Sequence, residues 1–175
     1  MVTDLSPGEL AENAKRSYQV GDLSAAIDGF AAAAAAYASE GDAPMAAEMK
    51  NNQSVTMLRD KQPQAALDAA RGTEGIFIEA GDARREGIAL ANQASALEAL
   101  KRHKESIDYY SRAGAALEKA GEVDFRLEVM QLLAALHLRR FKIFDAIIAL
   151  QSGLAGIKNP TPRQRFMKKL LFFQL

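Results

Sequence analysis

The dipeptides Gly41-Asp42, Gly81-Asp82 and Gly121-Glu122 follow one another at a constant interval of 40 residues (81 − 41 and 121 − 81). A fixed period in this range is typical of architectures in which one supersecondary unit is stacked on the next. Glycine suits the left-handed backbone that closes a helix, and a following aspartate suits the N-cap of the next helix. We therefore expect each dipeptide to separate two helices of a repeat array.

A second register runs through the middle of each unit. Small residues recur at one position, and a branched aliphatic residue follows each of them: Ala26-Ile27, Ala66-Leu67, Ser106-Ile107 and Ala146-Ile147. Four units are therefore expected, at about residues 7–40, 43–80, 83–120 and 123–157, each with two helices joined by a short turn. Together they make one domain over residues 1–158, because such units bury their apolar faces only against their neighbours.

Local capping signals set the expected helix boundaries. Ser6-Pro7-Gly8-Glu9 and Thr161-Pro162-Arg163-Gln164 each combine a capping box with proline at the first helical position. No segment alternates with period two over a useful length, so we expect an all-α chain without strands. The expected helices span residues 7–20, 23–40, 43–60, 63–80, 83–101, 104–120, 123–140, 143–157 and 162–175.

The composition narrows the class of protein. Hydrophobic residues make up 49% of the chain, and many of them are alanine, the strongest helix former. There is no cysteine, which excludes disulfides and thiolate metal sites. The first residues lack the pattern of a secretory leader, and no stretch approaches the roughly 20 apolar residues of a membrane span. We expect a soluble, cytoplasmic protein.

Charge is distributed unevenly although the net charge is zero. Residues 1–138 carry 14 Lys and Arg against 21 Asp and Glu, a balance of −7. Residues 139–175 carry 8 basic residues against Asp145 alone, a balance of +7. Such asymmetry can steer partners or favour head-to-tail association. Variation on solvated faces, without a function, is the alternative interpretation.

Two units carry the motif of a known repeat. The third contains Ala91-Asn92-Gln93-Ala94-x-x-Leu97 followed by Ser106-Ile107-x-Tyr109-Tyr110-x-x-Ala113, and the first contains Gly21-Asp22-x-x-x-Ala26-Ile27-x-x-Phe30. On these residues the chain resembles the tetratricopeptide repeat (TPR) family over about residues 8–158, in the longer variety of kinesin-light-chain-like arrays. The resemblance implies a right-handed superhelical stack of four TPR-like repeats, whose first helices line a concave groove for a peptide or partner helix.

The resemblance also implies which side chains face that groove. The positions carried over are Lys15, Tyr18, Glu48, Asn51, Asn52, Val55, Arg59, Ile88, Asn92, Ser95, Glu98, Glu128, Gln131, Ala135 and Arg139. The amide chemistry of Asn52 and Asn92 supports the assignment independently, since an asparagine can both donate to and accept from a peptide backbone. These two residues lie one period apart and are expected to form a ladder. The alternative is that they bridge helix ends or face water.

Motifs for catalysis or cofactor binding are not found. His103 and His137 have no carboxylate cluster at ligand spacing, and the glycines are single rather than grouped in a phosphate-binding loop. No serine has a histidine at a motif-like spacing. We therefore expect no enzyme activity, no cofactor and no metal. Nucleic-acid binding is disfavoured as well, because there is no basic stripe with interleaved aromatics.

The last segment, residues 159–175, is more apolar than a solvent-facing end of an array should be. Its candidate association surface consists of Phe166, Met167, Leu170, Leu171 and Phe173. Three interpretations stay open: a helix that caps the fourth unit, a homodimer seam or the start of a further repeat, and a basic amphipathic helix on an anionic membrane. The membrane is the least favoured of the three.

The sequence thus favours a non-enzymatic scaffold that binds a protein or peptide partner in the groove of a TPR-like array. The alternative is a regulatory or assembly module that self-associates through its apolar, basic C-terminal end. The residues do not identify the partner.

Overall fold

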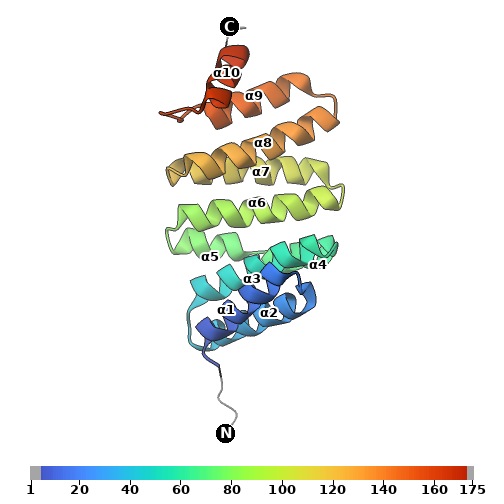
Figure 1. Ribbon diagram of the computed structural model, residues 1–175, viewed down its shortest axis with the longest axis vertical. Coiled ribbons are helices and arrows are strands. Elements are labelled where there is room, and N and C mark those ends of the chain that lie inside the picture. The colour runs from blue at the N-terminus through green and yellow to red at the C-terminus, as the bar shows by residue number, and fades with distance from the viewer. Residues whose placement is uncertain (1–4, 173–175) are drawn as a thin grey trace.

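The computed structural model describes residues 5–172, and in that range it contains helices and no strand. The helices lie across the long axis of the molecule and are stacked along it (Figure 1). Their bounds are α1 Pro7–Val20, α2 Leu23–Ser39, α3 Ala43–Arg59, α4 Pro63–Ala70, α5 Thr73–Glu79, α6 Ala83–Ala99, α7 His103–Lys119, α8 Val123–Arg139, α9 Ile143–Leu154 and α10 Pro162–Phe172. The expected all-α repeat stack is confirmed.

Successive helices pack as pairs. The closest packing joins α6 with α7, α2 with α3, α1 with α2, and α8 with α9; α3 also packs on α4, and α10 packs on α9. The turns inside the pairs lie along one edge of the stack, and the turns that connect α5 to α6 and α7 to α8 lie along the other edge (Figure 1). The first helices of consecutive pairs therefore run parallel to one another.

The turns between units have the geometry that the glycine–aspartate register predicts. Gly41, Gly81 and Gly121 adopt φ values of 81°, 68° and 72°. Asp42 accepts a hydrogen bond from the backbone N–H of Met45 at 3.0 Å, and Asp82 accepts the equivalent bond from Arg85 at 2.9 Å. The glycines thus close one helix and the two aspartates cap the next, whereas Glu122 in the third turn makes no side-chain cap.

The turns inside units two, three and four reach the same left-handed backbone without glycine. Lys61, Lys101 and Phe141 have φ values of 60°, 60° and 58°. A side chain with a Cβ atom pays a steric cost in this region of backbone space. These three positions recur at the 40-residue period, so the cost is a regular property of the array.

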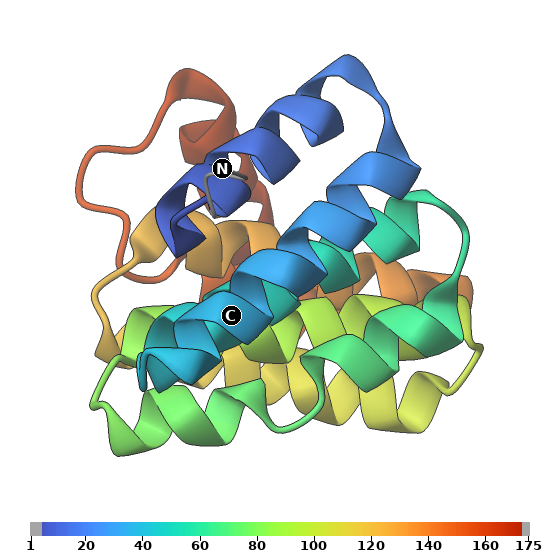
Figure 2. The same cartoon turned by 90° about the horizontal axis from the view of Figure 1, so that it is seen from below.

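The prediction of one helix over residues 63–80 is wrong. The chain leaves the helix at Arg71 and Gly72, where Gly72 has φ 80°, and resumes it at Thr73. The Thr73 hydroxyl donates to the carbonyl oxygen of Ala70 at 2.7 Å and accepts from the Asn51 amide at 2.9 Å. The first bond satisfies a carbonyl oxygen at the end of α4, and the second ties the start of α5 to α3. The green link between α4 and α5 is visible in Figure 2. The fourth unit is also shorter than expected, since α9 ends at Leu154.

The two helices of each pair approach each other closely at the small residues of the second register. Ala26, Ala66, Ser106 and Ala146 are all buried. Ser106 keeps its hydroxyl satisfied by donating to the carbonyl oxygen of Ala94 at 2.9 Å. The apolar core is divided among several clusters: one lies around α1 to α3, a large one spans α6 to α9, and two smaller ones lie between them.

Candidate functional site

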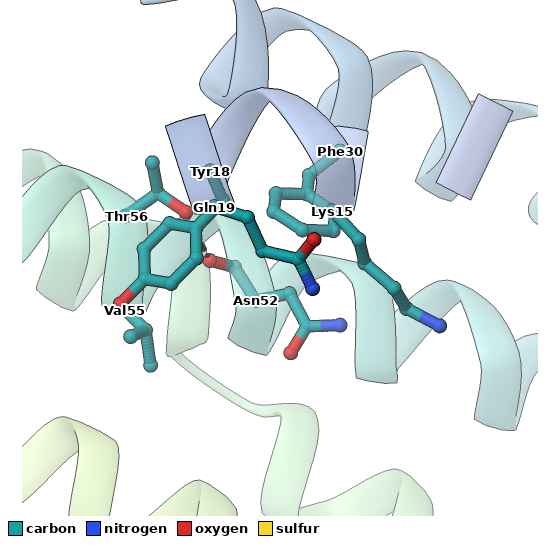
Figure 3. A pocket seen from close by; sticks show the side chains of 7 residues that line it. All are labelled: Lys15, Tyr18, Gln19, Phe30, Asn52, Val55 and Thr56. Carbon is teal, nitrogen blue, oxygen red and sulfur yellow. Dashed lines mark hydrogen bonds between the residues drawn. The ribbon is translucent and has the colours of Figure 1, made fainter. Parts of the chain in front are cut away.

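Two adjoining hollows lie on the face formed by the first helices of units one to three. The first has a volume of about 210 Å³ and is lined by Lys15, Tyr18, Gln19, Phe30, Asn52, Val55 and Thr56 (Figure 3). The second has a volume of about 340 Å³ and is lined by Glu48, Asn51, Asn52, Val55, Phe77, Arg84, Arg85, Ile88 and Asn92. Asn52 and Val55 line both, so the two hollows adjoin at α3, and we refer to them together as the depression across α1, α3 and α6.

The first hollow combines an apolar floor with polar walls. Phe30 is buried beneath it, whereas Lys15 projects away from the other lining residues (Figure 3). Arg59 lies beside this hollow: its guanidinium is 4.8 Å from the centre of the Tyr18 ring, and its Nη1 donates to the Tyr18 carbonyl oxygen at 3.1 Å. Arg59 therefore holds Tyr18 in place by a cation–π contact and a hydrogen bond.

The second hollow is bordered by a charged cluster. Arg85 binds Asp82 at 2.7 Å and Glu48 at 3.3 Å, and its guanidinium lies 5.6 Å from the centre of the Phe77 ring. The backbone N–H of Arg85 and its side chain hold the pKa of the Asp82 carboxyl below its usual value. Arg84 pairs with Glu122 at 2.9 Å. These contacts fix the guanidinium groups at the rim.

Neighbouring asparagines of α3 have different roles. Asn51 is only 5% exposed, donates to the Ala47 carbonyl oxygen at 3.0 Å and to Thr73, and accepts from the Asn92 amide at 3.3 Å. Asn52 is half-buried and lines both hollows. We predicted that both face a ligand. Asn51 lines the second hollow, as predicted, but it is largely buried and its amide is already used to hold α3, α5 and α6 together.

Further along the first helices, the predicted groove residues bind one another. The hydroxyl groups of Ser95 and Tyr110 are 3.1 Å apart, and the Tyr110 hydroxyl donates to Glu98 at 3.2 Å. Arg139 forms an ion pair with the other carboxylate oxygen of Glu98. Burial raises the pKa of Tyr110 to about 12, so its phenol stays a hydrogen-bond donor. The structure therefore brings Ser95, Glu98 and Arg139 together in one network.

The fourth unit contributes less to the depression. Glu128 and Gln131 are exposed on α8, and neither lines the two hollows of the first helices. Gln131 instead lies with Leu127 beside the start of α10, around a separate hollow of about 400 Å³. Ala135 is half-buried on the same helix. The last helix thus stands next to the unit-four end of the row of first helices.

Several lining residues were missed by sequence reasoning. Gln19 and Phe77 were not among the predicted groove residues, and Phe30 was a residue of the repeat motif without an expected place in the groove. Arg84 and Arg85 follow the N-cap residue Asp82 directly, and one period earlier the same positions hold Pro44 and Met45. The sequence signal that could have identified them is a pair of arginines at positions where the preceding unit carries no charge.

The last helix is held at two points and leaves part of its apolar surface exposed. Gln151 donates to the carbonyl oxygen of Leu171 at 2.7 Å, and Lys168 donates to that of Ile157 at 3.0 Å. Phe166 and Leu170 remain 67% and 62% exposed. Met167 and Leu171 are half-buried, and Phe173 lies outside the described residues.

The histidines do not form a metal centre with neighbouring groups. His137 is buried with its Nδ1 atom 3.7 Å from the Asp145 carboxylate, and burial lowers its pKa. Within residues 5–172 no three or more histidine, aspartate or glutamate side chains come together as metal ligands would. Over the same range no helix combines the length and apolarity needed to cross a bilayer.

Solved structures of helical repeats superpose on this chain. One is a Podosopora anserina "putative kinesin light chain" with nearly identical TPR-like repeats, which matches with a TM-score of 0.73 and 16% identity over 94% of this chain and 86% of its own. A single-substitution variant of that protein matches with the same TM-score and 15% identity, over 94% of this chain and 85% of its own. The fold is that of a TPR-like repeat array. No protein-family model matches the sequence, and no curated protein matches it either.

This TPR-like array agrees with the resemblance that the motifs of units one and three indicate. At 16% identity the likeness concerns the fold alone. The placement of the first helices side by side, with their exposed residues along one face, is the part of that fold on which the site depends.

Proposed function

We propose that the chain is a non-enzymatic scaffold that binds a protein segment, as a peptide or a partner helix, in the depression across α1, α3 and α6. The observation that supports this most directly is that the two hollows adjoin at Asn52 and Val55, which line both of them. Folds of the TPR-like kind serve in general as protein-interaction scaffolds, and 16% identity to such arrays carries no more specific partner.

The lining chemistry suits a peptide. Phe30 and Phe77 lie beneath the two hollows and offer apolar floors for ligand side chains. Asn52, Asn92 and Gln19 carry amides that can pair with an extended backbone. Pockets with an apolar floor and a few placed polar groups are typical of binding sites.

The charges at the rim suit a ligand with an acidic group. Arg84 and Arg85 border the second hollow, and Lys15 borders the first. Arg84 and Lys15 are among the exposed residues, so they remain accessible although each pairs with a carboxylate, Glu122 and Glu12 respectively. A carboxylate on the ligand would compete for these cations.

The proposal is tested by panning a random-peptide display library on the protein and measuring the affinity of a selected peptide. Asn52→Ala removes an amide from the centre of the depression and is expected to weaken binding about tenfold, as for a lost hydrogen bond to a desolvated group. Gln64→Ala is the matched control, because Gln64 is an exposed amide on α4 that lines neither hollow. Peptides that bind Asn52→Ala and the wild type equally would contradict the proposal.

A second candidate is self-association through α10, which the exposure of Phe166 and Leu170 favours. Replacing both residues with serine is then expected to convert a dimer to a monomer in sedimentation velocity. Peptide binding to the depression should be unaffected by that change. A wild-type chain that sediments as a monomer at all concentrations rules out this candidate.

A further inference from the structure

The turn between α8 and α9 is an apolar tip on the edge of the stack. Phe141 and Phe144 are 92% and 83% exposed. Leu138 and Ile143, which flank them, are also exposed. Solvent contact on this scale is unusual for large apolar side chains that lie so close together, and such clusters mark interaction sites.

The apolar residues of the tip occupy positions that are polar in units two and three. Positions 141, 144 and 148 hold Phe141, Phe144 and Ile148 in unit four. One and two periods earlier they hold Lys101, Lys104 and Asp108, and Lys61, Gln64 and Asp68. All nine side chains are exposed. Units two and three have neighbours on both sides, and these positions still face solvent there. A further repeat stacked on unit four would therefore leave the three apolar side chains uncovered.

Stability of the array does not account for Phe141. Its backbone is left-handed, with φ 58°, a conformation that glycine adopts at least cost. At 92% exposure its ring contributes almost no buried area. Lys61 and Lys101 share this backbone, so what distinguishes Phe141 is a large apolar ring that the core does not use, and such a ring indicates a role outside the fold.

Basic residues alternate with the apolar ones in this turn, which reads Leu138-Arg139-Arg140-Phe141-Lys142-Ile143-Phe144. Arg139 is used by Glu98, and Lys142 lies 3.5 Å from Asp145. Among the ion pairs of residues 5–172, none involves Arg140, and none involves Lys101 or Lys104 of the preceding turn on the same edge (Figure 1). The edge therefore presents cations beside the apolar tip.

We infer that this edge docks on the surface of an anionic lipid bilayer. Phe141 and Phe144 would enter the headgroup region, and Arg140, Lys142, Lys101 and Lys104 would face lipid phosphates and carboxylates. Phe141 and Phe144 line none of the hollows described above, whereas Ile148 borders a hollow of about 310 Å³ between α8 and α9; the two exposed rings therefore suit a flat surface better than a peptide. The docking is peripheral, and it is separate from the proposed peptide site.

The test is cosedimentation with vesicles of phosphatidylcholine alone and of phosphatidylcholine mixed with phosphatidylserine. The wild-type chain is expected to pellet with the mixed vesicles only. The triple variant Phe141→Lys, Phe144→Gln, Ile148→Asp introduces the residue types that unit two carries at these positions, so the fold accommodates them and the net charge is unchanged. It is expected to lose at least about tenfold in affinity, because the buried apolar area is gone.

Two further variants separate charge from apolarity. Arg140→Gln with Lys142→Gln should lower affinity for the mixed vesicles by about fivefold per residue. Ile78→Ser is the matched control, since Ile78 is an exposed apolar residue at the end of α5, near the opposite edge, and its loss should change nothing. Circular dichroism and thermal melting verify that each variant is folded.

Three outcomes overturn the inference. The first is a wild-type chain that stays in the supernatant with the mixed vesicles. The second is vesicle binding that the triple variant retains, which would assign it to another surface such as α10. The third is a wild-type dimer that the triple variant abolishes in the absence of vesicles, without any vesicle binding, which would make the tip a contact between copies.

Discussion

The Asn92 amide donates to the Asn51 side-chain oxygen at 3.3 Å, and these residues are 41 positions apart rather than 40. The same separation recurs where Arg59 donates to Tyr18 and where Arg139 binds Glu98. Residues one full period apart point in the same direction, so they can form a ladder but cannot face each other. A hydrogen bond between consecutive first helices therefore has to join different positions of the repeat.

The two adjacent asparagines of α3 should respond differently to substitution. Asn51→Ala is expected to lower the free energy of unfolding by about 1–3 kcal/mol, because the polar groups of Thr73 and Asn92 lose a buried partner. Asn52→Ala should change it by less than about 0.5 kcal/mol, as for a surface site. Urea unfolding of both variants measures the difference. Equal effects would contradict the assignment of Asn51 to the core.

Two glycines within helices should respond with opposite signs. A Cβ at Gly29 would lie 2.9 Å from the Ala14 Cβ and 3.2 Å from its Cα, so Gly29→Ala is expected to cost about 1–3 kcal/mol. A Cβ at Gly75 would meet no atom within 4 Å, and Gly75→Ala should stabilise by up to about 1 kcal/mol. Thermal melting checks both. A stable Gly29→Ala variant would show that α1 and α2 can separate at no cost.

Phe141→Gly should stabilise the chain. The substitution removes the steric cost of the left-handed backbone, which is about 1 kcal/mol. The greater flexibility of glycine in the unfolded state offsets part of this gain. Phe141→Ala is the control, because it removes the same ring and keeps the strained backbone. Denaturant midpoints are expected to rank glycine above both alanine and the wild type. A glycine variant no more stable than the alanine variant would mean that the turn carries no strain.

His137 should make the fold sensitive to mild acid. Burial lowers its pKa below the ordinary value of 6.5, with Lys142 and Arg140 acting in the same direction and Asp145 opposing them. The unfolded chain then binds the proton more readily, so the free energy of unfolding falls as pH drops below about 6.5. His137→Gln should reduce the loss of stability between about pH 7 and pH 5. An identical pH profile for both proteins would contradict this assignment.

Most of the fold follows from local sequence signals. The glycine–aspartate register and the buried small residues determine where helices meet, and they depend only on the chain near each turn. The break at Gly72 could not be found in this way, because a single glycine is tolerated within a helical pattern. It depends on Thr73 reaching Asn51, which is 22 positions away, and only the packing of α3 against α5 brings them together.

The sequence predicts which face of the first helices forms the site, but not how deeply each side chain on that face is buried. The repeat register placed Asn52 and Asn92 on one face, and both line the second hollow. It could not distinguish Asn51 from Asn52, since one residue is a rotation of about 100° and the burial of each depends on the neighbouring helices. It also gave no reason for Phe141, whose exposure becomes informative only beside Lys61 and Lys101 in the same turn geometry.

Because the apolar core is separated into clusters along the stack, ligand binding and local unfolding of the helix pairs are linked. Each helix pair is stabilised mainly by the pairs next to it, so the outermost pairs fray first and exchange their amide hydrogens sooner. A segment bound across α1, α3 and α6 would stabilise the first helices of three consecutive units against local unfolding. Ligand binding would then slow amide hydrogen exchange in α1, without a change in the shape of the array.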